Sequence, residues 1–353
     1  MPETTAATIG WSTCSEAADA GREAATAALS KLSLRQPRLA LVFGSSWLHQ
    51  EQLLGGVRAV LGDVPVAGES TAGEIIPEGP ITHSCVVLLL ASHAVSCSVG
   101  LGQDVDVDPR RAGQQAAYTA VHSFHGQERA GFLLFGDGLM TSYTKVVRGI
   151  QEVLGTSSLI VGGMAGDDLR FRQTYQYGND RVVSRAVAGV LLSRPLQIGV
   201  GIEHGFAPIS KPRRITRANA NRLLELDGQP AASVYAEYLG TEALQHMQEA
   251  GLTRQGIAYP FGIQVEPHGD WLLRTVIARG EDGGLSCSGE IPEGAWLQLM
   301  IGSRELALDA AHRAAQQAIR SLRRVVCVLV FDSVVRRMLL GAQHAALEVA
   351  RIR

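Results

Sequence analysis

The sequence is poor in cysteine, with five in 353 residues, and no two of them have Cys-x-x-Cys spacing. An odd number without that spacing argues against a disulfide framework and against common redox and zinc motifs. Cys85 and Cys327 lie in apolar runs, which is typical of reduced, buried thiols. The cysteine pattern therefore predicts a cytoplasmic protein.

Long apolar runs and a secretory start are also missing. The longest runs, such as Cys85–Ala91, are far shorter than the roughly 20 residues of a membrane-spanning helix. Residues 1–5 lack the basic start and apolar stretch of a signal peptide. We therefore expect no membrane insertion.

Neither sign of charge dominates. The chain has 32 Lys and Arg against 34 Asp and Glu, a formal net charge of -2. Nucleic-acid-binding proteins carry a basic surface that neutralises phosphates. The one basic run, Lys211 to Arg214 with Arg217, is short, and we interpret it as a solvated strand end. No nucleic-acid partner is expected.

Motifs of common enzyme classes are absent or incomplete. There is no Walker A sequence, no His-Glu-x-x-His and no set of metal ligands at helical spacing. Gly199–Gly205 begins like a dinucleotide fingerprint, but its third glycine is displaced and no helix follows. Gly68–Gly73 is one residue too long for a nucleophile elbow around Ser70. We expect a protein that is not an enzyme and has no metal or cofactor, with a hydrolase using Ser70 as an alternative.

What the sequence does contain is an internal repeat. Leu41-Val42-Phe43-Gly44-Ser45 recurs as Leu133-Leu134-Phe135-Gly136-Asp137, and again as Leu329-Val330-Phe331-Asp332-Ser333. In the first two copies a glycine-acid pair, Gly73-Glu74 or Gly166-Asp167, follows the phenylalanine after 30 or 31 residues. Repeats of this kind decide the fold before any local prediction. The unit predicts an α/β (α+β) fold of repeated strand-helix-strand units, with mixed sheets flanked by helices.

Periodicity and capping signals divide these units into elements. The sequence predicts helices at 12–32, 47–61, 108–122, 142–154, 231–239, 303–322 and 343–351. It predicts strands at 38–43, 64–67, 131–135, 159–162, 175–177, 259–265 and 271–278, a hairpin from 85 to 100 and another from 186 to 201. A third-copy strand is expected from Val325.

Two glycine-bearing loops, at 68–74 and 163–168, are the predicted ligand site. Open α/β sheets bind ligands outside the carboxyl ends of their strands. Acidic side chains there suit an amine, and glycine amides suit a carboxylate. The predicted ligand-binding residues are Glu69, Ser70, Thr71, Gly73, Glu74, Asp137, Gly163, Met164, Gly166, Asp167 and His204.

Each of these features also has a structural interpretation. Glycines permit tight turns, and acids cap the elements that follow them. His204 follows a predicted strand and lies between an acidic residue and Gly205-Phe206. Its imidazole is able to ligate haem iron there, or to form a hydrogen bond with nearby backbone. Both interpretations stay open, and no metal is expected unless haem binds His204.

Several segments resemble the FIST family. Val66–Glu74, Gly199–Pro208 and Leu226–Ala231 resemble its N-terminal domain, and Tyr259–Ile263, Ile291–Gly294 and Val330–Ser333 resemble its C-terminal domain. The resemblance implies an N-terminal sensory domain at 1–230 and a C-terminal domain at 231–353. FIST proteins are regarded as intracellular sensory modules for small ligands such as amino acids, and some bacterial members as haem-containing nitric oxide sensors working with a histidine kinase.

The chain departs from the family pattern in two places. Ser333 stands where the family usually has cysteine, so a role for that thiol has no support. The family also continues to a Gly-Glu-Ile segment like Gly73-Glu74-Ile75, which predicts that this chain is truncated at its C-terminus. The resemblance implies a bacterial signal-transduction sensor that binds an amino acid or similar ligand and passes the signal to a separate partner. The alternatives are a haem-based nitric oxide sensor acting with a histidine kinase, a hydrolase, and an interaction scaffold.

Overall fold

The computed structural model describes residues 5–32, 36–242, 254–266 and 269–353, which form two compact units. The first unit comprises Met1–Gly201 and Gln316–Val334, and the second comprises Ile202–Ala315 and Val335–Arg353. None of the helices that the structure describes is both long and apolar enough to cross a bilayer.

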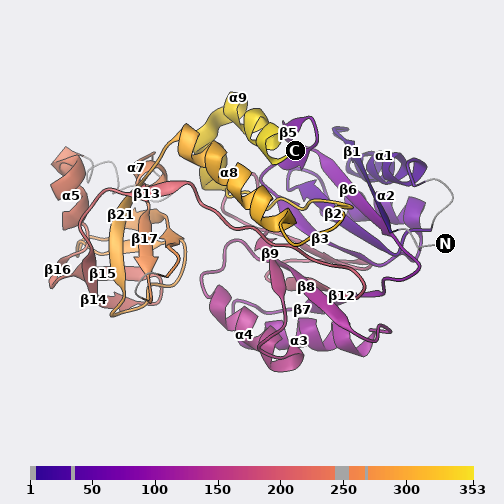
Figure 1. The fold of residues 1–353 in the computed structure, drawn as a ribbon, viewed down its shortest axis with the longest axis horizontal. Coiled ribbons are helices and arrows are strands. Elements are labelled where there is room, and N and C mark those ends of the chain that lie inside the picture. Colours follow the sequence, from indigo (N-terminus) through magenta and orange to yellow (C-terminus); the bar gives the residue numbers. More distant parts are fainter. Residues whose placement is uncertain (1–4, 33–35, 243–253, 267–268) are drawn as a thin grey trace. The chain divides into compact units, whose positions relative to one another are not determined.

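The first unit contains two large sheets, a two-stranded sheet formed by Glu74–Ile76 and Gly79–Ile81, and two pairs of helices (Figure 1). Its strands are β1 (Ala6–Ser12), β2 (Leu39–Ser45), β3 (Val66–Thr71), β4 (Glu74–Ile76), β5 (Gly79–Ile81), β6 (Cys85–Ala91), β7 (Cys97–Gly102), β8 (Arg129–Gly136), β9 (Ile160–Met164), β10 (Gln176–Gly178), β11 (Arg181–Val183) and β12 (Val187–Ser193). Its helices are α1 (Ala17–Ser30), α2 (Gln50–Leu61), α3 (Pro109–His122) and α4 (Tyr143–Leu154).

The topology of this unit confirms the repeat. The first sheet has the order β1-β6-β2-β3-β10-β11, and the second has the order β7-β12-β8-β9. In both, the first three strands are antiparallel neighbours, while β2 and β3, like β8 and β9, run parallel. Residues 6–91 and 97–193 are therefore two copies of one strand-helix-strand-helix-strand unit, closed by an antiparallel strand.

The layers follow from which face of each strand is apolar. One face of the first sheet packs on α1 and α2, and one face of the second packs on α3 and α4. The remaining faces meet each other, with Leu41 and Leu88 of the first sheet packed with Leu133 and Phe135 of the second. Each such buried side chain contributes about 1.5–3 kcal/mol. The unit is thus a helix-sheet-sheet-helix sandwich, which confirms the predicted α/β class.

The second unit is built on antiparallel strands. Its strands are β13 (Phe206–Pro208), β14 (Arg213–Asn219), β15 (Arg222–Leu226), β16 (Gln229–Pro230), β17 (Phe261–Gln264), β18 (Leu272–Arg274), β19 (Val276–Arg279), β20 (Leu285–Cys287) and β21 (Trp296–Gly302). Its helices are α5 (Ser233–Leu239), α7 (Arg254–Ala258) and most of α8 (Arg304–Ile319) and α9 (Val334–Ile352). Tyr235 and Phe261 pack edge to face in its core.

Local signals placed several helices correctly. The Asp108 carboxylate accepts the N–H of Arg111 at 3.0 Å at the start of α3, and Pro109 is the first helical residue. Ser303 caps α8 through the N–H of Leu306 at 3.2 Å. Gly155 ends α4. Side-chain caps and a terminal glycine therefore act as their sequence pattern predicts.

Four local predictions are wrong. The helix expected from Ser12 begins at Ala17, because residues 6–12 form β1. The expected hairpin at 85–100 does not form: β6 belongs to the first sheet and β7 to the second. Of the hairpin at 186–201 only β12 is present, and the expected strand from Val325 is not a strand. Apolar alternation predicts an extended segment, but it does not identify the partner strand.

Candidate functional site

The two glycine-bearing loops lie side by side at the carboxyl ends of the parallel strand pairs. The Gly166 N–H donates to the Ser70 carbonyl at 2.9 Å, and the Asp168 N–H donates to the Thr71 carbonyl at 3.3 Å. A Cβ on Gly166 would collide with the backbone of Thr71 and Ala72. The two loops are thus joined directly by backbone hydrogen bonds.

The acidic residues of the first loop are buried. Glu69 and Glu74 are 4% and 3% exposed. Burial raises the pKa of Glu69 well above its usual range, and a hydrogen bond from the Gly136 N–H partly offsets this. Burial also raises the pKa of Glu74 to about 7, against the effect of hydrogen bonds from Ser84 and Thr71. The Glu74 carboxyl group thus joins Thr71 to Ser84, whereas Oε2 of the buried Glu69 has no hydrogen-bond partner among the described residues.

Ser70 has a positioning role in the same loop. Its side chain is fully buried, its hydroxyl donates to the Gly166 carbonyl at 2.7 Å, and it accepts the Tyr175 N–H at 2.9 Å. A serine nucleophile needs an exposed hydroxyl and a neighbouring base. This environment gives the hydrolase interpretation no support.

The second loop is a strained turn held by its own carboxylates. Asp168, Leu169 and Phe171 have φ values of 54°, 64° and 52°, in a region that costs such residues roughly 1–3 kcal/mol each. Asp167 accepts the N–H groups of Phe171, Arg172 and Gln173 at 2.9, 2.6 and 3.2 Å. This carboxylate thereby fixes the path of residues 171–173.

Asp168 ties that turn to the first copy. Its Oδ2 accepts the Ser45 hydroxyl at 2.9 Å and both the N–H and the hydroxyl of Ser46 at 2.8 Å. Arg170 donates to the Ser46 carbonyl and lies over the Trp47 ring. The contact between this turn and the first copy is therefore polar, in contrast to the apolar core between the two sheets.

The remaining predicted residues of these loops differ in exposure. Met164 is half exposed, whereas Gly163 lies under the Phe331 ring. Gly73 has a φ of 137° and donates its N–H to the Thr71 hydroxyl at 3.4 Å. Whether any of them touches a ligand stays a prediction.

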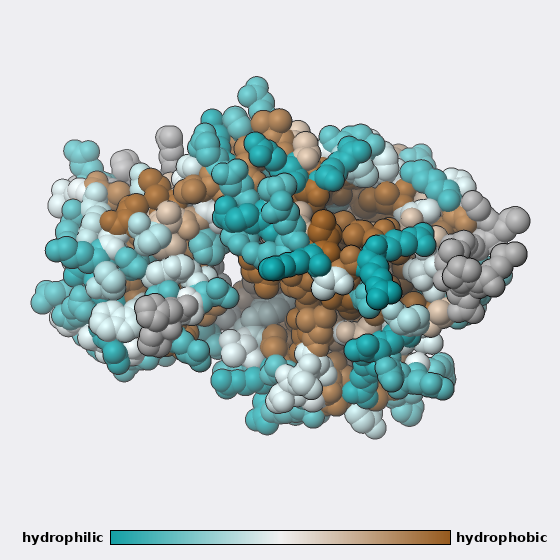
Figure 2. Space-filling view, viewed as in Figure 1, coloured by the Kyte–Doolittle hydropathy of each residue, from teal (hydrophilic) through white to brown (hydrophobic). Residues whose placement is uncertain are grey.

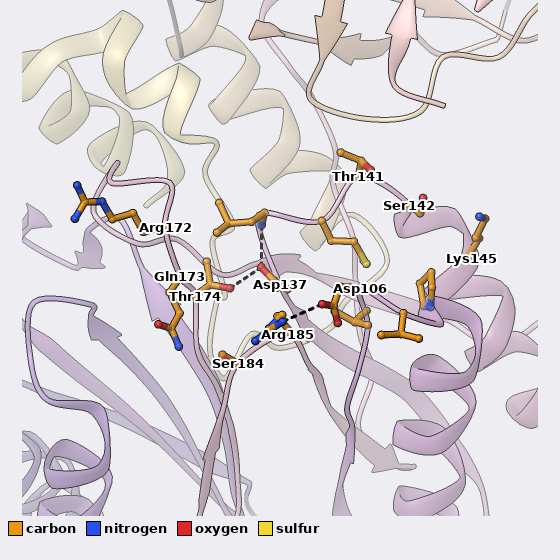
Figure 3. A pocket seen from close by; sticks show the side chains of 15 residues that line it. Asp106, Asp137, Thr141, Ser142, Lys145, Arg172, Gln173, Thr174, Ser184 and Arg185 are labelled. Carbon is orange, nitrogen blue, oxygen red and sulfur yellow. Dashed lines mark hydrogen bonds and ion pairs between the residues drawn. The ribbon is translucent and has the colours of Figure 1, made fainter. Parts of the chain in front are cut away.

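A groove of about 680 Å³ lies beside the loops, on the second copy. Figure 3 shows it around Asp137, the residue that follows β8, with the start of α4 on one side and residues 172–174 on the other. Its lining consists of Val105, Asp106, Val107, Pro109, Asp137, Leu139, Met140, Thr141, Ser142, Lys145, Arg172, Gln173, Thr174, Ser184 and Arg185. Of the predicted ligand-binding residues, Asp137 alone lines it.

Asp137 is oriented by its neighbours. Its Oδ1 accepts the Leu139 N–H at 2.9 Å and the Thr174 hydroxyl at 2.7 Å. No hydrogen bond reaches its Oδ2 within the ranges that the structure describes. One carboxylate oxygen therefore has capacity for a donor from a ligand.

Cations and a helix end provide the opposite charge. Lys145 lies in the first turn of α4, and Arg172 lies on the facing wall. Ser142, the N-cap of α4, makes no capping bond with its side chain. The first N–H groups of a helix carry partial positive charge and attract anions. Arg185 is engaged with Asp106 at 3.1 Å.

Sequence reasoning missed most of this groove. Lys145, eight residues after Asp137 at a predicted helix start, was the available signal. The sequence around Arg172 and Arg185 carries no signal that they line the groove, because their loops reach it through tertiary packing. Asp167 accepts the N–H groups of Arg172 and Gln173, two residues of one wall, and a direct contact of Ser70 or Asp167 with a ligand stays a prediction.

His204 belongs to the second unit. Its Nδ1 accepts the Phe206 N–H at 3.0 Å, and its carbonyl accepts from Arg336 at 3.0 Å. Burial lowers its pKa, which favours the neutral ring. A neutral ring that accepts at Nδ1 carries its proton on Nε2, the nitrogen that iron would need. This conformation does not fit haem ligation through Nε2.

No group of three or more His, Cys, Asp and Glu side chains is placed to hold a metal ion among the described residues.

Comparison with known proteins agrees with the architecture. An uncharacterized protein of Methanocaldococcus jannaschii is 33% identical over 92 residues, which are 26% of this chain and 18% of that protein. Uncharacterized proteins of two Mycobacterium tuberculosis strains are each 25% identical over 321 residues, covering 87% of this chain and 81% of theirs. The FIST N domain model matches residues 38–229, and the FIST C domain model matches residues 231–353. FIST domains are associated with sensing in signal transduction, and this chain belongs to the FIST family.

Proposed function

We propose that the protein is a cytoplasmic sensor that binds a small zwitterionic ligand, such as an amino acid, in the groove around Asp137. It acts without turnover and without a resident cofactor. A separate signalling protein, such as a histidine kinase, reads the change.

The observation that carries this proposal is the division of charge in the groove. Asp137 offers a carboxylate oxygen to an ammonium group, while Lys145 and the first turn of α4 offer positive charge to a carboxylate. Charge-assisted hydrogen bonds of this kind are about twice as strong as neutral ones. The groove thus has a place for each end of an α-amino acid.

The strained turn gives a physical route for the signal. Asp167 holds Arg172 and Gln173 through their N–H groups, and both residues line the groove. A ligand that engages Arg172 favours one arrangement of this turn over others. Ligands shift such equilibria only through different affinities for the two states. The turn also carries the exposed side chains of Leu169 and Phe171, which a partner is able to contact.

A thermal-shift screen against the standard amino acids tests the proposal. A ligand that binds only the folded state at about 100 times its Kd adds roughly 2.7 kcal/mol of stability. Lys145→Ala is expected to abolish the shift. Arg148→Ala removes an exposed cation one turn further along α4, outside the groove, and is expected to retain it. A shift that both variants retain would place the ligand elsewhere.

A further inference from the structure

The carboxyl end of β2, in the first copy, holds a carboxylate as a binding site holds a ligand. Three donors converge on Oδ2 of Asp168: the Ser45 hydroxyl at 2.9 Å, and the N–H and hydroxyl of Ser46 at 2.8 Å each. Both serine side chains are buried. Hydrogen bonds to an ionised acceptor are about twice as strong as neutral ones. The two serines therefore form a site for one carboxylate oxygen.

A cation site adjoins this carboxylate site. The guanidinium carbon of Arg170 lies 4.8 Å from the centroid of the Trp47 ring, and Nη2 of Arg170 donates to the carbonyl and the hydroxyl of Ser46 at 2.8 Å each. His83 packs edge-on against the same ring, with centroids 5.6 Å apart. The surface of the first unit includes apolar side chains (Figure 2), and Trp47 is 60% exposed. The Ser46 hydroxyl thus contacts both charged groups.

Both sites are occupied by the strained turn of the second copy. Asp168, Leu169 and Phe171 have positive φ values, which such residues keep only where surrounding contacts impose them. The turn therefore binds the first copy at a conformational cost. A free molecule that offers the same two charged groups without that cost is able to compete with the turn.

The repeat indicates that this place is equivalent to the ligand groove. Ser45 occupies the position that Asp137 has in the second copy, and Asp137 faces the groove. Open α/β sheets bind ligands outside this end of their strands. In the first copy the position is filled by Asp168 and Arg170, so the chemistry of these two side chains identifies the ligand that would replace them.

We propose that Ser45, Ser46 and Trp47 form a second ligand site, which takes a small molecule carrying a carboxylate and a guanidinium group. Asp168 and Arg170 are its internal competitor. Because the site is open only in the fraction of molecules whose turn has left it, the apparent affinity is reduced by that fraction. A ligand that binds here releases the turn. This inference does not depend on a ligand in the groove.

Calorimetric titration with L-arginine tests the internal competitor. Every chain carries Lys145→Ala, which is expected to remove binding in the groove. Asp168→Asn with Arg170→Gln removes both charges of the competitor, and asparagine tolerates the positive φ of position 168. L-arginine is expected to bind this double variant roughly tenfold tighter than the Lys145→Ala parent, because the site is open in more of the molecules. Equal affinities would overturn the proposal, as would no binding to a double variant that circular dichroism shows to be folded.

Two analogues of L-arginine test the ligand chemistry. Agmatine lacks the carboxylate, and L-citrulline has an uncharged group in place of the guanidinium. Each is expected to bind the double variant roughly tenfold more weakly than L-arginine does, because one charge-assisted contact is lost. An analogue that binds as tightly as L-arginine would overturn the proposed ligand class.

Further variants locate the binding. Ser46→Ala, added to the double variant, removes the hydroxyl that both charged groups share and is expected to abolish the gain in affinity. Ser30→Ala, at the exposed end of α1, is the control and is expected to keep it. The tryptophan fluorescence change on adding L-arginine is expected to be lost in Trp47→Phe. Full binding with Ser46→Ala, or a fluorescence change that persists without Trp47, would overturn the proposal.

Arg170→Gln alone is a milder variant, because it changes one exposed side chain and leaves Asp168 in place. It is expected to increase the affinity for L-arginine by a smaller factor than the double variant does. An affinity equal to that of the Lys145→Ala parent would contradict a competing guanidinium and would overturn the proposal.

Discussion

The first two copies of the repeat share one topology and differ at the carboxyl ends of their strands. In the first copy, the hydroxyl groups of Ser45 and Ser46 donate hydrogen bonds to Asp168, and the buried Glu74 accepts one from the Ser84 hydroxyl. In the second copy, Asp137 stands at the position of Ser45 and faces a groove. The repeated backbone therefore creates two equivalent ends, and side chains close one of them and leave the other open.

The largest expected effect tests whether the two copies are packed alike. Gly56 of α2 and Gly149 of α4 lie against helix carbonyls, those of Ala18 and Arg110, where a Cβ would collide. Gly56→Ala and Gly149→Ala are each expected to lower the free energy of unfolding by about 3 kcal/mol, measured by urea denaturation.

The neighbouring Gly55 is the matched control, because a Cβ there meets nothing within 4 Å. Gly55→Ala is expected to raise the free energy of unfolding by up to about 1 kcal/mol, since alanine is the better helix former. A harmless Gly149→Ala would show that the second helix pair packs differently from the first.

The buried acid of the first copy gives the next effect. The pKa of Glu74 is raised to about 7 in the folded protein, so the folded state binds more protons than the unfolded state between its ordinary pKa and that value. The contribution of the protonated Glu74 carboxyl group to the free energy of unfolding is complete below the ordinary pKa of glutamate. It is lost as the pH rises through 7. Glu74→Gln is therefore expected to be more stable than the wild type at pH 8, by at most about 3 kcal/mol.

The same pair of proteins supplies its own control at pH 5, where Glu74 is protonated in the folded state. There the variant is expected to match the wild type or to be slightly less stable, because an amide accepts fewer hydrogen bonds than a carboxyl group. Thermal unfolding at both pH values measures the difference. A gap that does not change between pH 5 and pH 8 would contradict a neutral Glu74.

The smallest of the three effects concerns the strained turn of the second copy. Asp167→Ala removes the acceptor of three backbone N–H groups and is expected to cost about 2 kcal/mol. The exposed Asp19→Ala, which breaks a surface pair with Arg22, is expected to cost less than about 1 kcal/mol. Chemical denaturation measures both. Equal costs would mean that Asp167 does not hold the turn.

Local chemistry made much of the fold predictable. Asp108-Pro109 and Ser303 predicted helix starts, and the recurrence of Phe43 as Phe135 identified the repeated strand-helix-strand units. β1 was missed because its alanines and threonine look like the start of the helix that follows. The assignment of β6 and β7 to different sheets depends on packing between layers, which no local pattern records.

The candidate site was predictable only in part. The sequence placed the two loops at strand ends, and the loops do meet. It did not show that polar groups of the two loops would form hydrogen bonds with each other. Asp137 was identified because it follows a strand in the repeat. Arg172 and Arg185 reach the groove from loops whose course depends on Asp167 and on positive φ angles. Such long-range placement has no sequence signature.

Calorimetric titration at Asp137 tests the central claim most directly. The amino acid giving the largest thermal shift would be titrated into the wild type, Asp137→Asn and Ser45→Ala. Binding to the wild type is expected to be lost in Asp137→Asn, because the ammonium loses its counter-charge, and to be kept in Ser45→Ala, which alters the equivalent position of the closed copy. Unchanged affinity in Asp137→Asn would contradict a ligand site in the groove of the second copy.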